Sequence, residues 1–174
     1  DPTSNNTRTS RTITWSVTDA NSDAVGAATG TTTSTISITA VNDAPVITPG
    51  TTLSYTENGS ATAINSALTL TDADDTQIAS ATVSITSPVT GDVLAFTNQN
   101  GITGSYNSGT GVLTLSGTAT VAQYQTALQS VTFSSTSEDP TSNNTRTSRT
   151  ITWSVTDANS DEVGAATGTN TSTI

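Results

Sequence analysis

The sequence contains no cysteine, no histidine and no lysine, and only 10% of its 174 residues are charged. Without cysteine there is neither a disulfide nor a thiol nucleophile, and without lysine there is no lysine–asparagine isopeptide cross-link. The lack of histidine removes the most common general base, so the composition argues against an enzyme. Oxygen ligands are all that remains for a metal ion, and carboxylate, amide and carbonyl oxygens suit calcium.

Basic charge is scarce as well: 14 acidic residues face 4 basic ones, which gives a formal net charge of -10. This balance excludes the basic surface that nucleic-acid binding requires. No apolar run approaches the roughly 20 residues needed to span a membrane. The chain opens without a signal peptide, and any targeting signal is expected elsewhere in a longer parent.

What the sequence has in abundance is threonine and serine, at 42 and 24 residues. Threonine favours strands because its branched Cβ packs well on a pleated surface. Alternating segments recur along the chain and are separated by turn signals such as Asn58-Gly59 and Asn100-Gly101. The expected strands are 12–18, 52–57, 66–72, 81–86, 92–98, 102–107, 112–118 and 150–156. This pattern predicts an all-β fold, a Greek-key β-sandwich of the immunoglobulin-like kind.

One stretch breaks the alternation. Val121, Tyr124 and Leu128 recur at helical spacing, and Thr120 is a suitable N-cap. We therefore expect one short helix over 121–129, which covers one end of the sandwich.

The strongest signal is an internal repeat, because residues 1–36 recur as 139–174 with 34 of 36 positions identical. Only Ala24 against Glu162 and Thr32 against Asn170 differ. A period of 138 residues predicts a tandem array. The segment VNDAPVI at 41–47 is typical of a linker between repeats.

The period predicts two parts. Residues 1–43 are the C-terminal part of a preceding repeat plus the junction, with a strand over 37–41. Residues 44–174 are a repeat that lacks most of its last strand. One hypothesis is that the 1–43 segment completes the sheet of a neighbouring molecule by strand addition. The alternative is an arbitrary window from a longer fibre.

Acidic residues cluster at turns. They occur in Asn42-Asp43, in the segment TDADD at 71–75, in VTDANSD at 155–161, and at Glu57. Carboxylates two residues apart can converge on calcium, which takes six to eight oxygen ligands. The competing interpretation is that Asp and Asn are simply good turn residues.

In combination, VNDAP, TDADD, GTATVAQYQTALQSVTF and RTITWSVTDANSD resemble cadherin-like domains, specifically the tandem repeats of very large bacterial adhesins. The resemblance spans the whole chain and implies calcium between successive repeats. Its ligands would be Asn42 and Asp43 in the junction, Asp72 and Asp74 near the start of the repeat, and Asp157 after a late strand. Glu57 would correspond to the glutamate of a Pro-Glu-Asn motif and would serve the next junction.

The expected function is therefore a structural and adhesive repeat in the stalk of a surface adhesin, outside the cell. Calcium would stiffen its junctions, and its partners would be neighbouring repeats or like molecules. A cell-surface or glycan receptor would be bound elsewhere in the parent. One alternative is a self-assembling filament subunit that is joined by intermolecular strand complementation. A carbohydrate-binding module is a further alternative, which the 4% aromatic content disfavours.

Overall fold

The computed structural model describes residues 3–4 and 7–174 of the chain. The chain divides into two compact units. The first, here called the hairpin unit, comprises Asp1–Val41 and Asp161–Val163. The second, the sandwich unit, comprises Asn42–Ser160 and Gly164–Ile174. Asn42 and Asp43, which we predicted as the end of the first part, thus belong to the second. None of the helices in the described residues has the length and apolar character that a membrane span requires.

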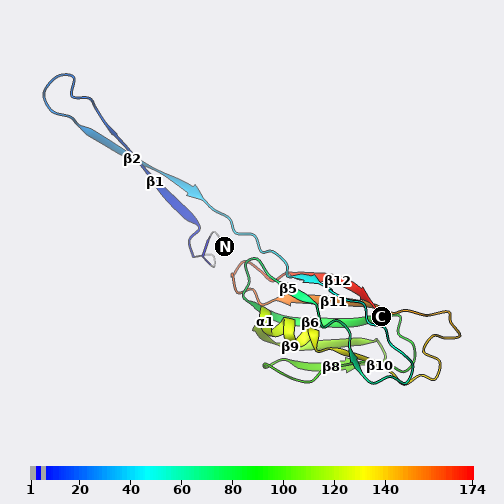
Figure 1. Cartoon of the computed structure of the whole chain (residues 1–174). Coiled ribbons are helices and arrows are strands. Elements are labelled where there is room, and N and C mark those ends of the chain that lie inside the picture. Colours follow the sequence, from blue (N-terminus) through cyan, green and yellow to red (C-terminus); the bar gives the residue numbers. More distant parts are fainter. Residues whose placement is uncertain (1–2, 5–6) are drawn as a thin grey trace. The chain divides into compact units, whose positions relative to one another are not determined.

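The hairpin unit is built on two antiparallel strands, β1 (Ser10–Thr18) and β2 (Thr29–Ser37) (Figure 1). Trp15 lies opposite Thr32, and its indole Nε1 donates a hydrogen bond to Ser34 Oγ at 2.9 Å. The alternating apolar side chains of β1 share one face, as predicted. That face is open to solvent, because the exposed fractions of Ile13, Trp15 and Val17 are 37%, 55% and 74%.

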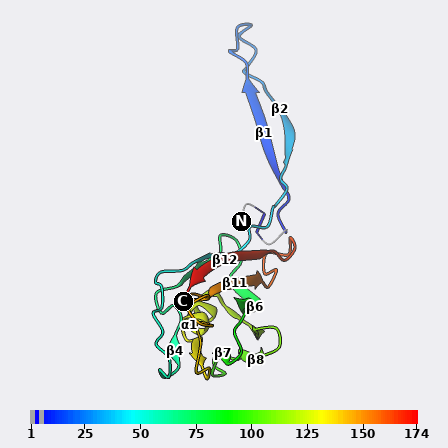
Figure 2. The same ribbon diagram turned by 90° about the vertical axis from the view of Figure 1, so that its right-hand side faces the viewer.

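The sandwich unit contains a five-stranded and a three-stranded sheet (Figure 2). The larger has the order β12-β11-β6-β9-β8, and the smaller β4-β10-β7, while β3 pairs with β5. The bounds of its strands are β3 Val46–Thr48, β4 Thr62–Ala63, β5 Thr69–Thr71, β6 Gln77–Thr86, β7 Asp92–Ala95, β8 Thr103–Asn107, β9 Val112–Thr120, β10 Thr132–Ser135, β11 Thr150–Asp157 and β12 Thr167–Thr173. The predicted fold class, an all-β sandwich with one short helix, is confirmed.

The chain passes between the two sheets from β6 to β7, back to β8 and β9, and again through α1 to β10. Strands from both sheets therefore contribute to a single apolar core. Trp153 in β11 is completely buried, while Phe133 from the smaller sheet is 3% exposed. Phe133 also meets the Tyr55 ring edge to face, with ring centroids 5.0 Å apart. Trp153 is thus a core anchor, as its alternating strand predicted.

Helix α1 runs from Val121 to Gln129 and confirms the predicted helix residue for residue. Thr120 caps it: its hydroxyl accepts a hydrogen bond from Gln123 N, and Gln123 Oε1 accepts one from Thr120 N. This capping box satisfies two amide groups that a helix start leaves unpaired. Tyr124 and Leu128 are fully buried, so the helix packs the predicted apolar face on the core.

One buried ion pair closes the sandwich beside β11. Arg149 Nε lies 2.6 Å from Asp92 Oδ2, and both side chains are almost completely buried. Arg149 Nη1 also donates to Arg146 O and Ser148 O, at 3.0 and 3.2 Å. These bonds satisfy a charge that would otherwise be costly inside a protein.

Two strand predictions were wrong. Residues 52–57 form no strand, although Leu53 and Tyr55 pack on the core. Tyr55 is held through its hydroxyl group, which donates to Gly59 O at 2.7 Å, rather than through a backbone ladder. Residues 38–41 form no strand either, because β2 ends at Ser37. The Thr-rich segment near the C-terminus, which no strand prediction covered, forms β12 over seven residues and pairs with β11.

Candidate metal centre

The loop between β5 and β6 brings three carboxylates together. One ligand oxygen each from Asp72, Asp74 and Asp75 lies within 4.8 Å of the others. The loop is shaped by Asp72, whose Oδ1 accepts hydrogen bonds from Asp74 N at 3.2 Å and Asp75 N at 2.9 Å. Such an Asx turn folds the backbone back on the side chain. The turn explains why three acidic residues so close in sequence all point to one place.

The segment that enters the sandwich unit joins this cluster. Asn42 Nδ2 donates a hydrogen bond to Asp157 Oδ2 at 3.0 Å, and Asp43 N donates to Asp74 Oδ2 at 3.0 Å. The side chain of Asp43 itself is exposed. The junction therefore reaches the cluster through the Asn42 amide and the Asp43 backbone, and Asp43 does not present its carboxylate in this arrangement.

The third contribution comes from the loop that follows β11. Asp157 is completely buried, and its carboxylate accepts hydrogen bonds from Asn159 N at 3.1 Å and Ala166 N at 2.8 Å. Farther along the loop, Ser160 donates to Asp75 Oδ1 from both its backbone amide and its hydroxyl group. This loop thus lies against the acidic cluster at the same end of the sandwich.

Several oxygen atoms of this centre are buried without any hydrogen-bond partner. They include Asn42 Oδ1, Asp72 Oδ2 and Asp74 Oδ1. Burial raises the pKa of Asp72 above its ordinary value. The backbone amides of Asp75 and Asp74, which donate hydrogen bonds to its carboxylate, lower the pKa, whereas the side chains of Asp74 and Asp75 raise it further. Two ionised carboxylates about 5 Å apart repel each other by roughly 3 kcal/mol at an effective dielectric constant near 20. A partly buried acidic cluster with unpaired buried oxygens is thus unfavourable unless a positive charge compensates it.

These residues fit a calcium ion. Calcium binds hard oxygen ligands and accepts irregular geometry, and the centre offers carboxylate oxygens together with an amide oxygen. Asn42 Oδ1 is the clearest candidate, since its amide nitrogen is already fixed by Asp157 and its oxygen is left without a partner. Asp72 and Asp74 would supply the carboxylates that neutralise the ion.

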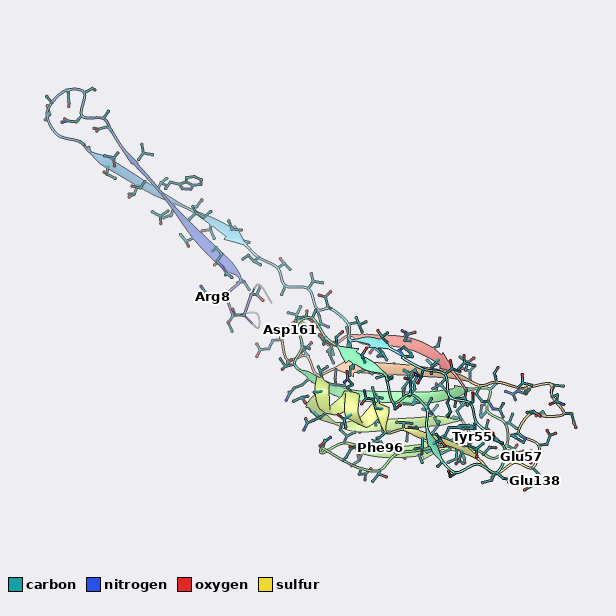
Figure 3. All side chains as sticks on the ribbon, in the orientation of Figure 1. Arg8, Tyr55, Glu57, Phe96, Glu138 and Asp161 are labelled. Atoms are coloured by element: carbon teal, nitrogen blue, oxygen red, sulfur yellow. The ribbon has the colours of Figure 1, made fainter. Side chains whose placement is uncertain are left out.

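Of the six predicted ligands, five therefore belong to one region and Glu57 does not. Glu57 is exposed, two residues from Tyr55, whose hydroxyl group contacts Ser135 O at 3.5 Å. Ser135 pairs with Asp92, the partner of Arg149 just before β11, whereas Asp157 ends β11. Glu57 and the acidic cluster thus lie at opposite ends of that strand. In the view of Figure 3, Tyr55, Glu57 and Glu138 are labelled at the same end of the sandwich unit.

Two residues of the centre were not among the predicted ligands. Asp75 is 4% exposed, and its position directly after Asp72 and Asp74 was the available signal. Ser160 had no distinguishing signal, because a serine in a Thr- and Ser-rich chain is unremarkable. Only the folded loop places Ser160 on Asp75.

Comparison with known proteins gives one partial likeness. The chain is 38% identical over 108 residues to Halomucin of Haloquadratum walsbyi. The match covers 58% of this chain and 1% of Halomucin, so the chain spans a very small part of that far longer protein. No protein-family model matches the chain, and no solved structure matches it.

Proposed function

We propose that this chain is a structural repeat of a large extracellular surface protein, and that calcium at the acidic centre stiffens the entry to each repeat. The observation that carries the proposal is the set of buried, unpartnered oxygens of Asn42, Asp72 and Asp74. A catalytic role is not part of the proposal, because the chain has no histidine, cysteine or lysine to serve as a base or nucleophile.

The repeat and the likeness to Halomucin support the structural part. Two segments that are identical at 34 of 36 positions are typical of an array that repeats one unit many times. An array of this kind is a spacer, since its repeats present the same surface again and again. The partial match to a protein many times longer fits a segment of a large polypeptide. We propose the stalk of a cadherin-like surface adhesin as the specific setting.

Calcium would act through the junction. Asn42 and Asp43 directly follow the hairpin unit, and both contact the acidic centre. An ion held by Asn42 Oδ1 and the carboxylates of Asp72 and Asp74 would fix the point at which the chain enters the sandwich. Loss of the ion would leave the carboxylates to repel one another and would loosen that entry. The ion would thus couple binding to rigidity without any reaction.

Thermal unfolding with and without calcium tests the proposal. A ligand at 100 times its Kd stabilises a folded protein by about 2.7 kcal/mol, and extracellular calcium modules have Kd values of roughly 10⁻⁴–10⁻³ M. Calcium at about 10 mM should therefore raise the melting temperature of the sandwich by several degrees relative to EDTA. Magnesium should do so much less, because it demands a tighter octahedral geometry.

Asp72→Asn separates an ion site from a merely structural turn. The amide Oδ1 can still accept hydrogen bonds from Asp74 N and Asp75 N, while the buried negative charge is lost. We expect the variant to be as stable as the parent chain, or more stable, in EDTA, because burial disfavours the ionised Asp72 carboxyl, as its raised pKa indicates. It should also lose the calcium-dependent increase. An unchanged increase in Asp72→Asn, or no increase in the parent chain, would contradict the proposal.

A matched control is provided by the repeat itself. Asp19 is the counterpart of Asp157, and its carboxylate accepts hydrogen bonds from Asn21 N and Ala28 N, as that of Asp157 does from Asn159 N and Ala166 N. Asp157→Asn should abolish the calcium response, whereas Asp19→Asn should leave it intact.

A further inference from the structure

The hairpin β1–β2 reproduces the hairpin β11–β12 in register and in local contacts. Trp15 lies opposite Thr32 and Trp153 opposite Asn170, and each indole Nε1 donates to a serine hydroxyl at 2.9 Å. The threonine hydroxyl pair at the other end of each hairpin is 2.7 Å apart in both. The chain therefore contains two copies of one hairpin, formed in two different environments.

The two copies differ in what covers their apolar face. Ile151, Trp153 and Val155 of β11 are all completely buried, and β11 pairs with β6 through positions 150–157. Their counterparts in β1 are 37%, 55% and 74% exposed, and among the described residues β1 is in a ladder with β2 alone. An exposed apolar patch of this kind marks an interaction surface. Here the sequence identifies the complementary surface, because the same side chains already fit it in β11.

Charge complementarity points to the same partner surface. Asp92 in the sandwich requires a buried cation, which Arg149 provides. Arg11, the counterpart of Arg149, is oriented by the same local bonds, from Nη1 to Arg8 O and Ser10 O at 2.8 and 2.9 Å. A docked β1–β2 hairpin would bring Arg11 to Asp92.

The two sequence differences between the hairpins should change the free energy of docking on the sandwich only slightly. Asn170 Nδ2 donates to Ile47 O at 2.7 Å, and its Oδ1 accepts from the neighbouring Thr171 N at 2.8 Å. Thr32 in its place would lose the hydrogen bond to Ile47. The other difference, Ala24 against Glu162, lies outside both strands of each hairpin. A neutral hydrogen bond contributes a small fraction of what a buried tryptophan does, so the two hairpins are nearly equivalent ligands for the sandwich.

We propose that β1–β2 is an interchangeable closing hairpin, which docks on the sandwich of a second copy of this chain in the place that β11–β12 occupies against β6. The proposal does not depend on calcium or on the surface-protein role. The docked hairpin would extend the five-stranded sheet through β1–β6 pairing and bury Ile13, Trp15 and Val17 in the partner's core.

Chain length excludes docking on the hairpin's own sandwich while the junction keeps its contacts. Ile38 still belongs to the hairpin, since its amide donates to Thr9 O at 2.8 Å. If the hairpin docked on its own sandwich and Asn42 kept its position there, Asn42 would have to lie next to Asp19 and Ala28, which are the counterparts of Asp157 and Ala166. Ala28 lies ten residues before Ile38, which is about 33 Å of extended strand.

The four residues from Ile38 to Asn42 reach at most about 14 Å. The Asn42 and Asp19 side chains with the hydrogen bond between them add roughly 10 Å, so the total falls short of 33 Å. Docking must therefore join different molecules. Each molecule would offer its hairpin to one neighbour and its sandwich to another, and such a heterologous contact generates open chains.

The molecule's own β11–β12 competes with the incoming hairpin and has the advantage of a covalent tether, which corresponds to a millimolar effective concentration. Exchange is therefore expected where β11–β12 is released. The test releases it deliberately in the full chain with Trp153→Asp, which places a charge in the core and leaves β1–β2 unchanged. Light scattering after size-exclusion chromatography then measures the assembly state.

We expect Trp153→Asp to form oligomers that grow with protein concentration, with the strand content of the parent chain by circular dichroism. Trp15→Asp alone should remain a folded monomer. The double variant Trp15→Asp/Trp153→Asp should neither oligomerise nor regain the sandwich, because no intact hairpin remains. A monomeric, unfolded Trp153→Asp chain would overturn the proposal. Oligomers that persist in the double variant would overturn it too, since they would arise from non-specific aggregation.

A disulfide cross-link tests the register in which β1 would pair with β6 of the second molecule. Ser154 lies opposite Thr82 in the β11–β6 pair, and Ser16 is the counterpart of Ser154. Ser16→Cys with Thr82→Cys, in the Trp153→Asp chain, should give a ladder of disulfide-linked oligomers, because the Cα atoms of directly opposed residues lie within the range that a disulfide can bridge. Moving the first cysteine to Thr12, four residues away, should abolish the ladder. Equal cross-linking from both positions would contradict the proposed docking position.

Discussion

Replacing each tryptophan by alanine compares the two hairpins in one molecule. Trp153 is completely buried, whereas Trp15 is 55% exposed. Truncation of a buried tryptophan typically costs about 3–5 kcal/mol of unfolding free energy, through lost burial and the cavity left behind. A substitution at an exposed position away from any core is usually within about 0.5 kcal/mol.

Each variant loses the same kind of hydrogen bond, because both tryptophans donate to a serine hydroxyl at 2.9 Å, so the difference between the variants reports mainly burial. We therefore expect Trp153→Ala to destabilise the sandwich by about 3–5 kcal/mol and Trp15→Ala to leave it almost unchanged. Urea unfolding followed by far-ultraviolet circular dichroism measures both, at low protein concentration so that hairpins do not exchange between molecules. Equal losses from the two variants would refute the assignment of one hairpin to a core and the other to solvent.

The buried ion pair gives a second prediction: Arg149→Met should cost about 3–5 kcal/mol by leaving Asp92 uncompensated, and Asp92→Leu in the same chain should recover most of it. Arg11→Met is the matched control and should change little, as measured by urea unfolding. Tyr124→Phe should cost about 1–2 kcal/mol, because the buried hydroxyl group donates to Ala79 O and Gly117 O at 3.2 and 2.7 Å. Burial raises the pKa of Tyr124 to about 12, so the parent chain should lose stability as the pH rises from the ordinary value near 10.0 through about 12. This loss should be smaller in Tyr124→Phe, and an identical alkaline profile for the two chains would exclude Tyr124 as its source.

The sequence predicted those elements whose signal is local. The helix over 121–129 followed from the spacing of its apolar residues and from the Thr120 cap, both of which are properties of adjacent residues. The strand around Trp153 followed from strict alternation. Alternation did not predict backbone pairing, because residues 52–57 place Leu53 and Tyr55 on the core without joining a β-ladder. Alternation reports which side chains are buried, and long-range pairing decides whether the backbone is a strand.

The acidic centre was predictable in part for a similar reason. The two-residue spacing of Asp72 and Asp74 predicted these two ligands, and the position of Asn42 in the junction predicted the third. That Asn42 reaches Asp157 across 115 residues of sequence is a property of the fold. So is the burial of its unpartnered oxygen, which is the strongest structural sign of a ligand.

The central claim is that calcium at this centre fixes the entry of the chain into the sandwich, and the distance between the two units measures that directly. The chain has no cysteine, so Thr33→Cys and Thr114→Cys allow specific spin labelling of one exposed strand position in each unit. Pulsed electron spin resonance should give a broad distance distribution in EDTA and a narrow one in calcium. The distance distribution of Asp157→Asn should remain broad in both EDTA and calcium, while that of Asp19→Asn should become narrow in calcium, as in the parent chain. A distribution that calcium leaves unchanged in the parent chain would contradict the account.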